Sequence, residues 1–332
     1  MLEESTLELL RDKKNLLAFS GGGDSTALFF LLIKNNIKFD IAIVDYALRE
    51  QSKEEVAYAQ ELANKYNLKC SLHVAQKIEQ NFEASARKIR YDFFEELIST
   101  CSYENLLTAH HLGDRFEWML MQFCKGAGCA ELVGMQNIEQ RENYKLIRPL
   151  LHVDKSELID YLHVEKIKYF EDETNKDESI KRNSFRHKYS TPLLKENLAG
   201  IKKSFAYLDE DKSHLIENVS PLHVEQFTYF KNSNTRTNIY YIDKHLKSLG
   251  FMITAKEREL LKHEKTLVLS RKYVVNQNES YVFIAPFIDE DITMPKEFKE
   301  EMRTLRIEPK LRKYFYKFPE VFKSLTLSEL FA

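Results

Sequence analysis

Short apolar runs alternate with longer amphipathic segments through the first half of the chain. Apolar runs between turn-forming residues predict buried strands, and apolar positions spaced three and four apart predict helices. The strands are expected at 15–19, 37–44, 70–74, 105–109 and 146–151. The helices are expected at 25–35, 53–66, 82–99 and 113–123, with another after Asp154, a suitable N-cap. This alternation predicts an α/β fold with a doubly wound parallel five-stranded sheet, whose ligands lie beyond the carboxyl ends of the strands.

The pattern changes after about residue 172. A helix is expected over 239–261, and a hairpin where the apolar runs 266–275 and 280–287 flank polar residues. We therefore expect a smaller α+β domain after the sheet domain, with boundaries of 1–203 and 204–332.

The charge of the whole chain is nearly balanced. Lysine and arginine number 49, aspartate and glutamate 51, and the net charge is −2, which excludes a uniformly basic nucleic-acid coat. Two stretches are nevertheless locally basic. Residues 181–203 contain seven bases and one acid, and residues 303–317 contain six bases and one acid together with Tyr314, Phe315 and Tyr316. Alone, such a run is more often a solvated face than a binding site.

Composition excludes several other classes. With 43% hydrophobic and 12% aromatic residues, the chain is not globally disordered. No apolar run approaches the ~18 residues of a membrane span, and the N-terminus carries acids where a secretory signal needs bases, so a cytoplasmic protein is expected. Four cysteines without a CxxC pair predict reduced thiols and no structural metal site.

The most informative motif is the segment 20–25, SGGGDS, between the first predicted strand and its helix. Glycines allow a close backbone approach, and a helix N-terminus presents unpaired N–H groups and a positive dipole end. The segment lacks the lysine of a GxxxxGK[ST] loop and the spacing of GxGxxG. It therefore predicts a pyrophosphate cradle of another kind, in preference to a plain glycine-rich turn.

A second cluster of polar residues follows the fourth predicted strand. His110 and His111 stand at the carboxyl edge of the sheet, and Asp114 and Glu117 share one face of the next helix. The two carboxylates are expected to hold Mg²⁺ or a substrate ammonium, with a solvated helix face as the alternative.

These segments resemble the PP-loop ATP pyrophosphatases and, among them, the tRNA(Ile)-lysidine synthases. The segment 20–25 is similar to the SGGxDS loop that holds ATP in that family. The other similar segments are 81–94 (NFEASARKIRYDFF), 108–117 (TAHHLGDRFE), 125–128 (KGAG), 132–135 (LVGM), 148–151 (RPLL), 172–175 (DETN) and 182–186 (RNSFR). The resemblance is collinear from about residue 12 to 193, and weak beyond.

The resemblance implies an adenine nucleotide α-hydrolase-like fold and an ATP-dependent ligase that forms a carbon–nitrogen bond. ATP would adenylate the C2 oxygen of the wobble cytidine (position 34) of tRNA(Ile) with a CAU anticodon. The ε-amine of free L-lysine would then displace AMP, giving lysidine. Residues 1–203 would be catalytic, and residues 204–332 would bind tRNA, with both basic stretches as tRNA contacts.

The same resemblance implies roles for individual residues. ATP-binding positions would be Ser20, Gly21, Gly22, Gly23, Asp24, Ser25 and His110, with Mg²⁺ at Asp24. Candidate catalytic carboxylates would be Asp24, Asp45, Asp114 and Glu117. Phosphate or tRNA contacts would come from Arg87, Arg90, Arg182 and Arg186. The alternative is surface pairing for Arg87 and Arg90, and a solvated face for Arg182 and Arg186.

The chain departs from the family's usual pattern at four positions. Gly113, Arg115 and Trp118 stand where Asp, Gln and Thr are usual, and Tyr46 stands where His is usual. One alternative is a tRNA-thiolating PP-loop enzyme, which paired cysteines would favour. Another is a nucleotide- or RNA-binding module without catalysis. The oligomeric state is open, with a homodimer among the options.

Overall fold

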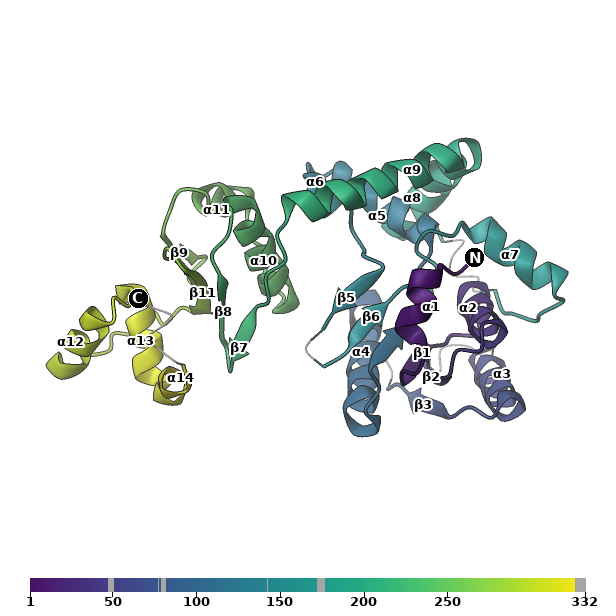
Figure 1. Ribbon diagram of the computed structural model, residues 1–332, viewed down its shortest axis with the longest axis horizontal. Coiled ribbons are helices and arrows are strands. Elements are labelled where there is room, and N and C mark those ends of the chain that lie inside the picture. The colour runs from purple at the N-terminus through teal and green to yellow at the C-terminus, as the bar shows by residue number, and fades with distance from the viewer. Residues whose placement is uncertain (47–50, 77, 79–81, 142, 172–176, 326–332) are drawn as a thin grey trace. The chain divides into compact units, whose positions relative to one another are not determined.

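The computed structural model describes residues 1–332 apart from 47–50, 77, 79–81, 142, 172–176 and 326–332 (Figure 1). The chain divides into two compact units, Met1–Asp209 and Glu210–Ala332. The division falls within helix α9 (Thr191–Leu215), a few residues beyond the 203/204 position expected from the sequence.

The first unit is an α/β fold on a mostly parallel sheet. Its strands are β1 (Asn15–Ala18), β2 (Phe39–Asp45), β3 (Cys70–Val74), β4 (Asn105–Leu107), β5 (Ile138–Gln140) and β6 (Lys145–Ile147). Its helices are α1 (Glu4–Leu10), α2 (Gly23–Lys34), α3 (Gln51–Tyr66), α4 (Phe82–Cys101), α5 (Leu112–Phe123), α6 (Cys129–Leu132), α7 (Lys155–Val164), α8 (Lys181–Phe185), the π-helical turn η2 (Arg186–Ser190) and α9.

The strands lie in the order β3-β2-β1-β4-β6-β5, and only β5 runs antiparallel to its neighbour. The predicted doubly wound α/β class is confirmed, with six strands in this sheet rather than five. The additional strand β5 is short and exposed at both ends, so no apolar run marks it in the sequence.

Alternate residues of the central strands face opposite sides of the sheet. Leu17 and Ile41 pack in a cluster with residues of α2, α3 and α7, whereas Leu16 and Ala42 pack in a cluster with residues of α4. Strands covered on both faces need apolar residues at consecutive positions, which explains why the predicted strands read as continuous apolar runs.

The connection from β3 to β4 determines where along the edge of the sheet a ligand can bind. The chain runs from β1 to β2 and β3 in one direction and then returns to β4 on the other side of β1. The segments that follow β1 and β4 therefore meet at a topological switch point. The strand expected at 146–151 ends at Ile147, because Pro149 has no N–H to donate to a ladder and the chain turns there.

The second unit has an antiparallel sheet in the order β7-β8-β11-β10-β9. Its strands are β7 (Leu222–Val224), β8 (Phe227–Lys231), β9 (Thr266–Leu269), β10 (Tyr273–Gln277) and β11 (Tyr281–Pro286). Its helices are α10 (Thr235–Ser248), α11 (Ala255–Leu260), α12 (Lys296–Thr304), α13 (Pro309–Lys317) and α14 (Pro319–Ser324). This agrees with the predicted α+β class.

Two expectations for this unit need correction. The helix expected over 239–261 is two helices, because Gly250, with φ of 75°, follows α10, and Thr254 caps α11. The hairpin expected around 276–279 is present as β10–β11, but the run 266–275 that leads into it is two strands, β9 and β10. These reverse at Ser270 and Arg271, where φ is 45° and 55°.

The aromatic residues of the basic stretch 303–317 are mainly core residues. Tyr314 and Phe315 are buried in a cluster with Phe227 and Phe283 of the sheet. Neither ring is available to stack on an RNA base, so the expected aromatic contribution to RNA binding is wrong for these two residues. Along the described part of the chain, no helix is both long and apolar enough to cross a membrane.

Candidate active site

The segment 20–25 forms a tight loop that its own serines hold in shape. Gly21 has φ of 75°, which favours glycine, and a Cβ at Gly23 would lie 3.0 Å from Cδ1 of Ile159 on α7. The Ser25 hydroxyl donates to the Gly22 carbonyl (3.1 Å) and lies 3.0 Å from the Ser20 hydroxyl. The glycines thus permit the turn and the close approach of α7, and the two serines fix the loop.

The loop leads directly into α2, whose first amides point out of the helix. Gly22 occupies the N-cap position and has no side chain with which to cap them. The first N–H groups of a helix have no partner within it, and the helix dipole favours negative charge there. This end of α2 is therefore suited to phosphate oxygens.

Asp24, in the first turn of α2, has one paired and one unpaired carboxylate oxygen. Its Oδ2 lies 3.3 Å from Lys155 Nζ and 3.8 Å from His111 Nε2. Its Oδ1 is buried and has no hydrogen-bond partner among the residues that the structure describes. An unpartnered buried carboxylate oxygen is costly unless a ligand satisfies it.

Lys155 is a functional candidate that the sequence analysis missed. It is the first residue of α7, directly after the N-cap Asp154, and brings a cation to a loop whose motif contains none. Nothing in the sequence links it to Asp24, because 131 positions separate the two residues.

His111 connects the loop to the second wall of the site, the segment after β4. It caps α5, and its Nδ1 accepts a hydrogen bond from the Gly113 N–H (3.0 Å). The proton of the neutral ring is therefore on Nε2, which faces Asp24 and lies 3.6 Å from Asp114 Oδ2. A Cβ at Gly113 would lie 2.7 Å from His111 Cε1, so this ring position depends on glycine at 113.

His110 is held neutral by its surroundings. Burial lowers its pKa to about 4, although the charge of Asp114 opposes the shift, and the charges of Arg148, Arg182 and Arg87 add to it. Its Nδ1 lies 3.0 Å from the Thr108 hydroxyl. At neutral pH the ring is an uncharged hydrogen-bonding group just beyond the end of β4.

Asp114 and Glu117 lie on one face of α5, as predicted, and meet Arg182 and Arg186. Glu117 is buried and accepts from Arg182 Nε and from Arg186 Nε (2.8 Å). Asp114 accepts from Arg182 Nη2 at 3.1 Å and Arg186 Nη2 at 3.4 Å. Burial alone would raise the pKa of Asp114. The charges of His111 and His110, which are protonated in the acid range where this carboxyl titrates, and of the two guanidiniums hold the pKa well below its usual range.

These contacts form a continuous polar network from the loop to α8 and η2. Its members are Asp24, His111, Asp114, Glu117, Arg182 and Arg186. The structure therefore joins four of the predicted site residues on α5, α8 and η2 to the loop acid, through His111.

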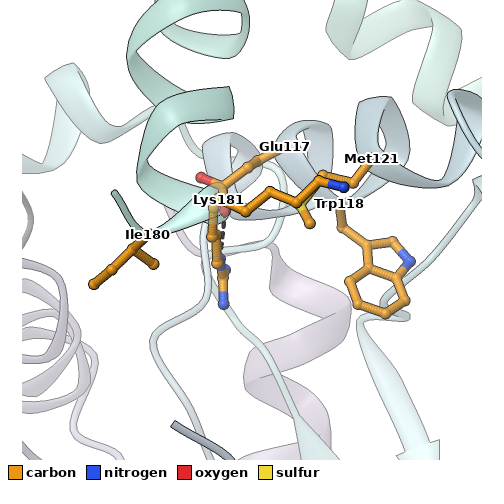
Figure 2. A pocket seen from close by; sticks show the side chains of 6 residues that line it. Glu117, Trp118, Met121, Ile180 and Lys181 are labelled. Atoms are coloured by element: carbon orange, nitrogen blue, oxygen red, sulfur yellow. Dashed lines mark hydrogen bonds and ion pairs between the residues drawn. The ribbon is translucent and has the colours of Figure 1, made fainter. Parts of the chain in front are cut away.

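A cavity of about 190 Å³ opens at the α5 end of the polar network. Its lining comes from two segments of the chain: Glu117, Trp118 and Met121 of α5, and the residues 180–182. Figure 2 shows Trp118 and Ile180 on opposite sides of this view, with Glu117 and Lys181 between them.

The remaining predicted residues lie on neighbouring elements. Asp45 ends β2, one strand away from β1, and its carbonyl accepts from Ala75 N–H (2.7 Å). Arg87 and Arg90 are located on α4, where the Arg87 guanidinium lies 4.7 Å from the Tyr91 ring centroid. Residues 172–175, the predicted DETN match, lie outside the described residues.

Two of the departures from the family pattern have structural explanations. Arg115 is fully buried, pairs with both carboxylate oxygens of Asp209 (2.9 and 2.5 Å) and lies over the Phe205 ring, so it anchors α5 to α9. Tyr46 donates to the Ala86 carbonyl (2.9 Å) and so ties the end of β2 to α4.

The donor set around Asp24 suits Mg²⁺ bound together with phosphates. Among the described residues, no three His, Cys, Asp or Glu side chains form a metal site. Mg²⁺ is commonly held by one or two carboxylates and by substrate phosphate oxygens, and the unpartnered Asp24 Oδ1 is a ligand of that kind.

Comparison with known proteins identifies relatives whose matches include all the residues of this site. Residues 2–193 match the family model of the PP-loop domain. The tRNA(Ile)-lysidine synthase of Helicobacter pylori (strain J99) is 43% identical over 311 residues, which cover 93% of this chain and 91% of that protein. The proteins of the same name from Wolinella succinogenes and Campylobacter jejuni (strain RM1221) are 45% and 39% identical. These matches cover 93% and 95% of this chain, and 94% and 96% of those proteins.

Proposed function

This chain belongs to the tRNA(Ile)-lysidine synthase family of PP-loop proteins, and from that membership we propose that it joins L-lysine to the wobble cytidine of tRNA(Ile) at the expense of ATP. The observation that carries the proposal is the polar network, which links a phosphate-binding loop to charged groups at the switch point of the sheet. ATP use follows from the PP-loop domain.

The reaction takes place in two steps. The C2 oxygen of cytidine attacks the α-phosphorus of ATP, and pyrophosphate leaves. The ε-amine of lysine then attacks C2, the C2–O bond breaks, and AMP leaves with that oxygen. The attacking ammonium loses two protons in giving the cationic C2–NH product, so the site has to accept protons as well as charge.

The loop, α2 and Lys155 are the groups suited to the triphosphate. The α2 amides and the Lys155 ammonium would offset negative charge on the leaving pyrophosphate. Asp24 and the ATP phosphates would hold Mg²⁺, which supplies further charge neutralisation when bound. The buried His111 ring would orient Asp24.

The carboxylates of α5 are suited to lysine once their present partners move. Two guanidiniums balance Asp114 and Glu117, so an added ammonium gains little until Arg182 or Arg186 turns to a phosphate. Lysine has an unperturbed pKa of about 10.4 and must deprotonate to attack. The neutral His110 imidazole is a candidate acceptor for a hydrogen bond from the amine, and Asp45 is a candidate partner for the amino-acid ammonium.

The remaining parts of the proposal concern how the protein binds tRNA and where in the cell it acts. We assign catalysis to residues 1–203 and a tRNA-binding role to residues 204–332. Arg87 and Arg90 of α4 are candidate RNA phosphate contacts. Since tRNA, lysine and ATP are the substrates, the cytoplasm is the proposed site of action.

Lysine incorporation into defined transcripts tests this function. The protein is incubated with ATP, Mg²⁺, radiolabelled lysine and tRNA(Ile) bearing C or U at the wobble position. We expect label only in the C transcript, with one AMP and one pyrophosphate formed per lysine. Asp24→Asn, the matched control, should form neither product while keeping the wild-type circular dichroism spectrum. Formation of AMP without incorporation of lysine would indicate another nucleophile. Absence of AMP formation would refute the proposed ligase activity.

A further inference from the structure

Trp118 is an exposed aromatic side chain beside the proposed reaction centre. It follows Glu117 on α5, lines the cavity of about 190 Å³ and is 46% exposed. It is also the single tryptophan of the chain. A large apolar ring left open to solvent next to buried charged groups is a candidate ligand contact.

The position of the indole is set by the backbone opposite. Gly134, with φ of 64°, leaves the room that the ring occupies, because a Cβ there would lie 2.6 Å from Trp118 Cδ1. The ring therefore rests against a main-chain surface. A stacking platform held in this way loses little side-chain entropy on binding.

The other residues of the cavity complement the aromatic ring. Met121 and Ile180 add apolar surface, and Lys181 adds positive charge, whereas the charge of Arg182 is balanced by Glu117 and Asp114. An aromatic face with cations nearby suits a nucleobase and its phosphate, because every base has a π-face and single-stranded RNA carries a charge at each nucleotide. A free amino acid does not need an exposed indole, and the adenine of ATP, which also has a π-face, is the competing occupant that the titration with ATP alone tests.

The cavity and the ATP loop lie at opposite ends of the polar network. Asp24 marks the loop end of the polar network, and Glu117 and Arg182 mark the cavity end. We propose that the cavity takes an unstacked nucleobase of the RNA substrate, stacked on Trp118, and that Trp118 thereby positions the anticodon loop. This inference rests on the proposed function, since it takes RNA as the substrate.

The single tryptophan allows the occupant to be observed directly. The full-length protein is titrated, without ATP, with an anticodon stem-loop RNA, and Trp118 emission is followed. We expect the stem-loop to quench the emission, and a stem-loop with an abasic wobble nucleotide to quench it much less. Quenching by ATP alone or by lysine alone, with none by RNA, would assign the cavity to another ligand and overturn the proposal.

Variants test the contribution of the ring to affinity. Stacking on an aromatic side chain contributes about 1–3 kcal/mol per base, so Trp118→Ala should weaken stem-loop binding in a filter assay by roughly 5- to 150-fold. Trp118→Phe and Trp118→Tyr should retain most of the affinity, and KM for ATP should be unchanged in all three. Phe123→Ala is the matched control, because Phe123 is 66% exposed on the same helix and does not line the cavity.

The outcomes separate this inference from the proposed function. If wild-type protein joins lysine to tRNA while Trp118→Ala binds RNA as tightly as Phe123→Ala does, the stacking role is wrong and the function stands. If wild-type protein fails to join lysine but RNA still quenches Trp118, the function is wrong and the RNA contact stands.

Discussion

The environment of Gly113 shows how one residue sets the chemistry of its neighbour. A side chain at this position would meet the His111 ring, and without it the ring turns toward Asp24 and Asp114. In the sequence, Gly113 stands beside Asp114 at a position where the family usually has Asp. In the structure, the His111 ring lies where a side chain at 113 would begin, and its Nε2 lies 3.8 Å from Asp24 Oδ2 and 3.6 Å from Asp114 Oδ2.

At the same scale, we expect Lys155 to contribute to the binding of ATP and not to the binding of lysine. Its ammonium is the cation nearest the loop acid among the described ion pairs, and a hydrogen bond to a charged group contributes roughly 1.5–3 kcal/mol, less when the donor is half exposed. We expect Lys155→Ala to raise KM for ATP about tenfold. KM for lysine should stay within about twofold, and Lys155→Arg should bring KM for ATP most of the way back to the wild-type value.

The measurement is steady-state kinetics with each substrate varied in turn. Lys34→Ala is the control, because Lys34 lies at the other end of α2 and pairs with Glu165. An unchanged KM for ATP in Lys155→Ala, or a lysine defect larger than the ATP defect, would remove Lys155 from the phosphate site.

Contacts between neighbours in sequence were predictable, and contacts between distant residues were not. The loop serines, the glycines and Asp24 lie within six consecutive positions, where spacing and residue type reveal the chemistry. Arg182 lies 65 positions from Glu117, and Lys155 lies 131 positions from Asp24. Only the folded chain shows which cation meets which acid.

At the scale of elements, the segment from α8 to α9 has an inner and an outer set of cations. Arg182 and Arg186 turn inward to the carboxylates of α5, although the family resemblance implies RNA contacts for them. Lys195 and Lys203 of α9 are exposed, and the Lys203 ammonium lies over the Tyr207 ring. The outer lysines are therefore the better candidates for RNA phosphates.

Salt dependence of tRNA binding should distinguish the two sets. Removing one phosphate-binding cation lowers the slope of log affinity against log salt by about 0.7–0.9, so Lys195→Ala with Lys203→Ala should lower it by roughly 1.5. The matched control is Lys38→Ala with Lys69→Ala, two exposed lysines before β2 and β3, at the opposite edge of the sheet. Equal slopes in the two double variants would show that α9 does not grip tRNA.

Elements with a strong apolar pattern were predicted well, and those shaped by backbone or tertiary contacts were not. The strands β1, β2 and β3 and the capped helix α7 follow directly from the sequence. The edge strand β5 buries too few side chains to show an apolar pattern in the sequence. The charge of the stretch 303–317 predicts a surface site, although Tyr314 and Phe315 lie in the core.

For the molecule as a whole, the two units differ in how clearly the sequence describes them. The first unit has a repeated strand–helix rhythm and motifs at the loops of its ligand edge. The second has short antiparallel strands whose order, β7-β8-β11-β10-β9, depends on pairings between distant segments. A net charge of −2 over the chain leaves RNA binding to local surfaces, which agrees with exposed lysines on α9.

The fate of the cytidine C2 oxygen tests the central claim most directly. The protein is given ATP, lysine and tRNA(Ile) whose wobble cytidine carries oxygen-18 at C2, and the AMP is analysed by mass spectrometry. Because the C2 oxygen bonds to the α-phosphate before the C2–O bond breaks, we expect one oxygen-18 in AMP for each lysine joined. Unlabelled AMP, with oxygen-18 retained in the tRNA or released to water, would contradict the account.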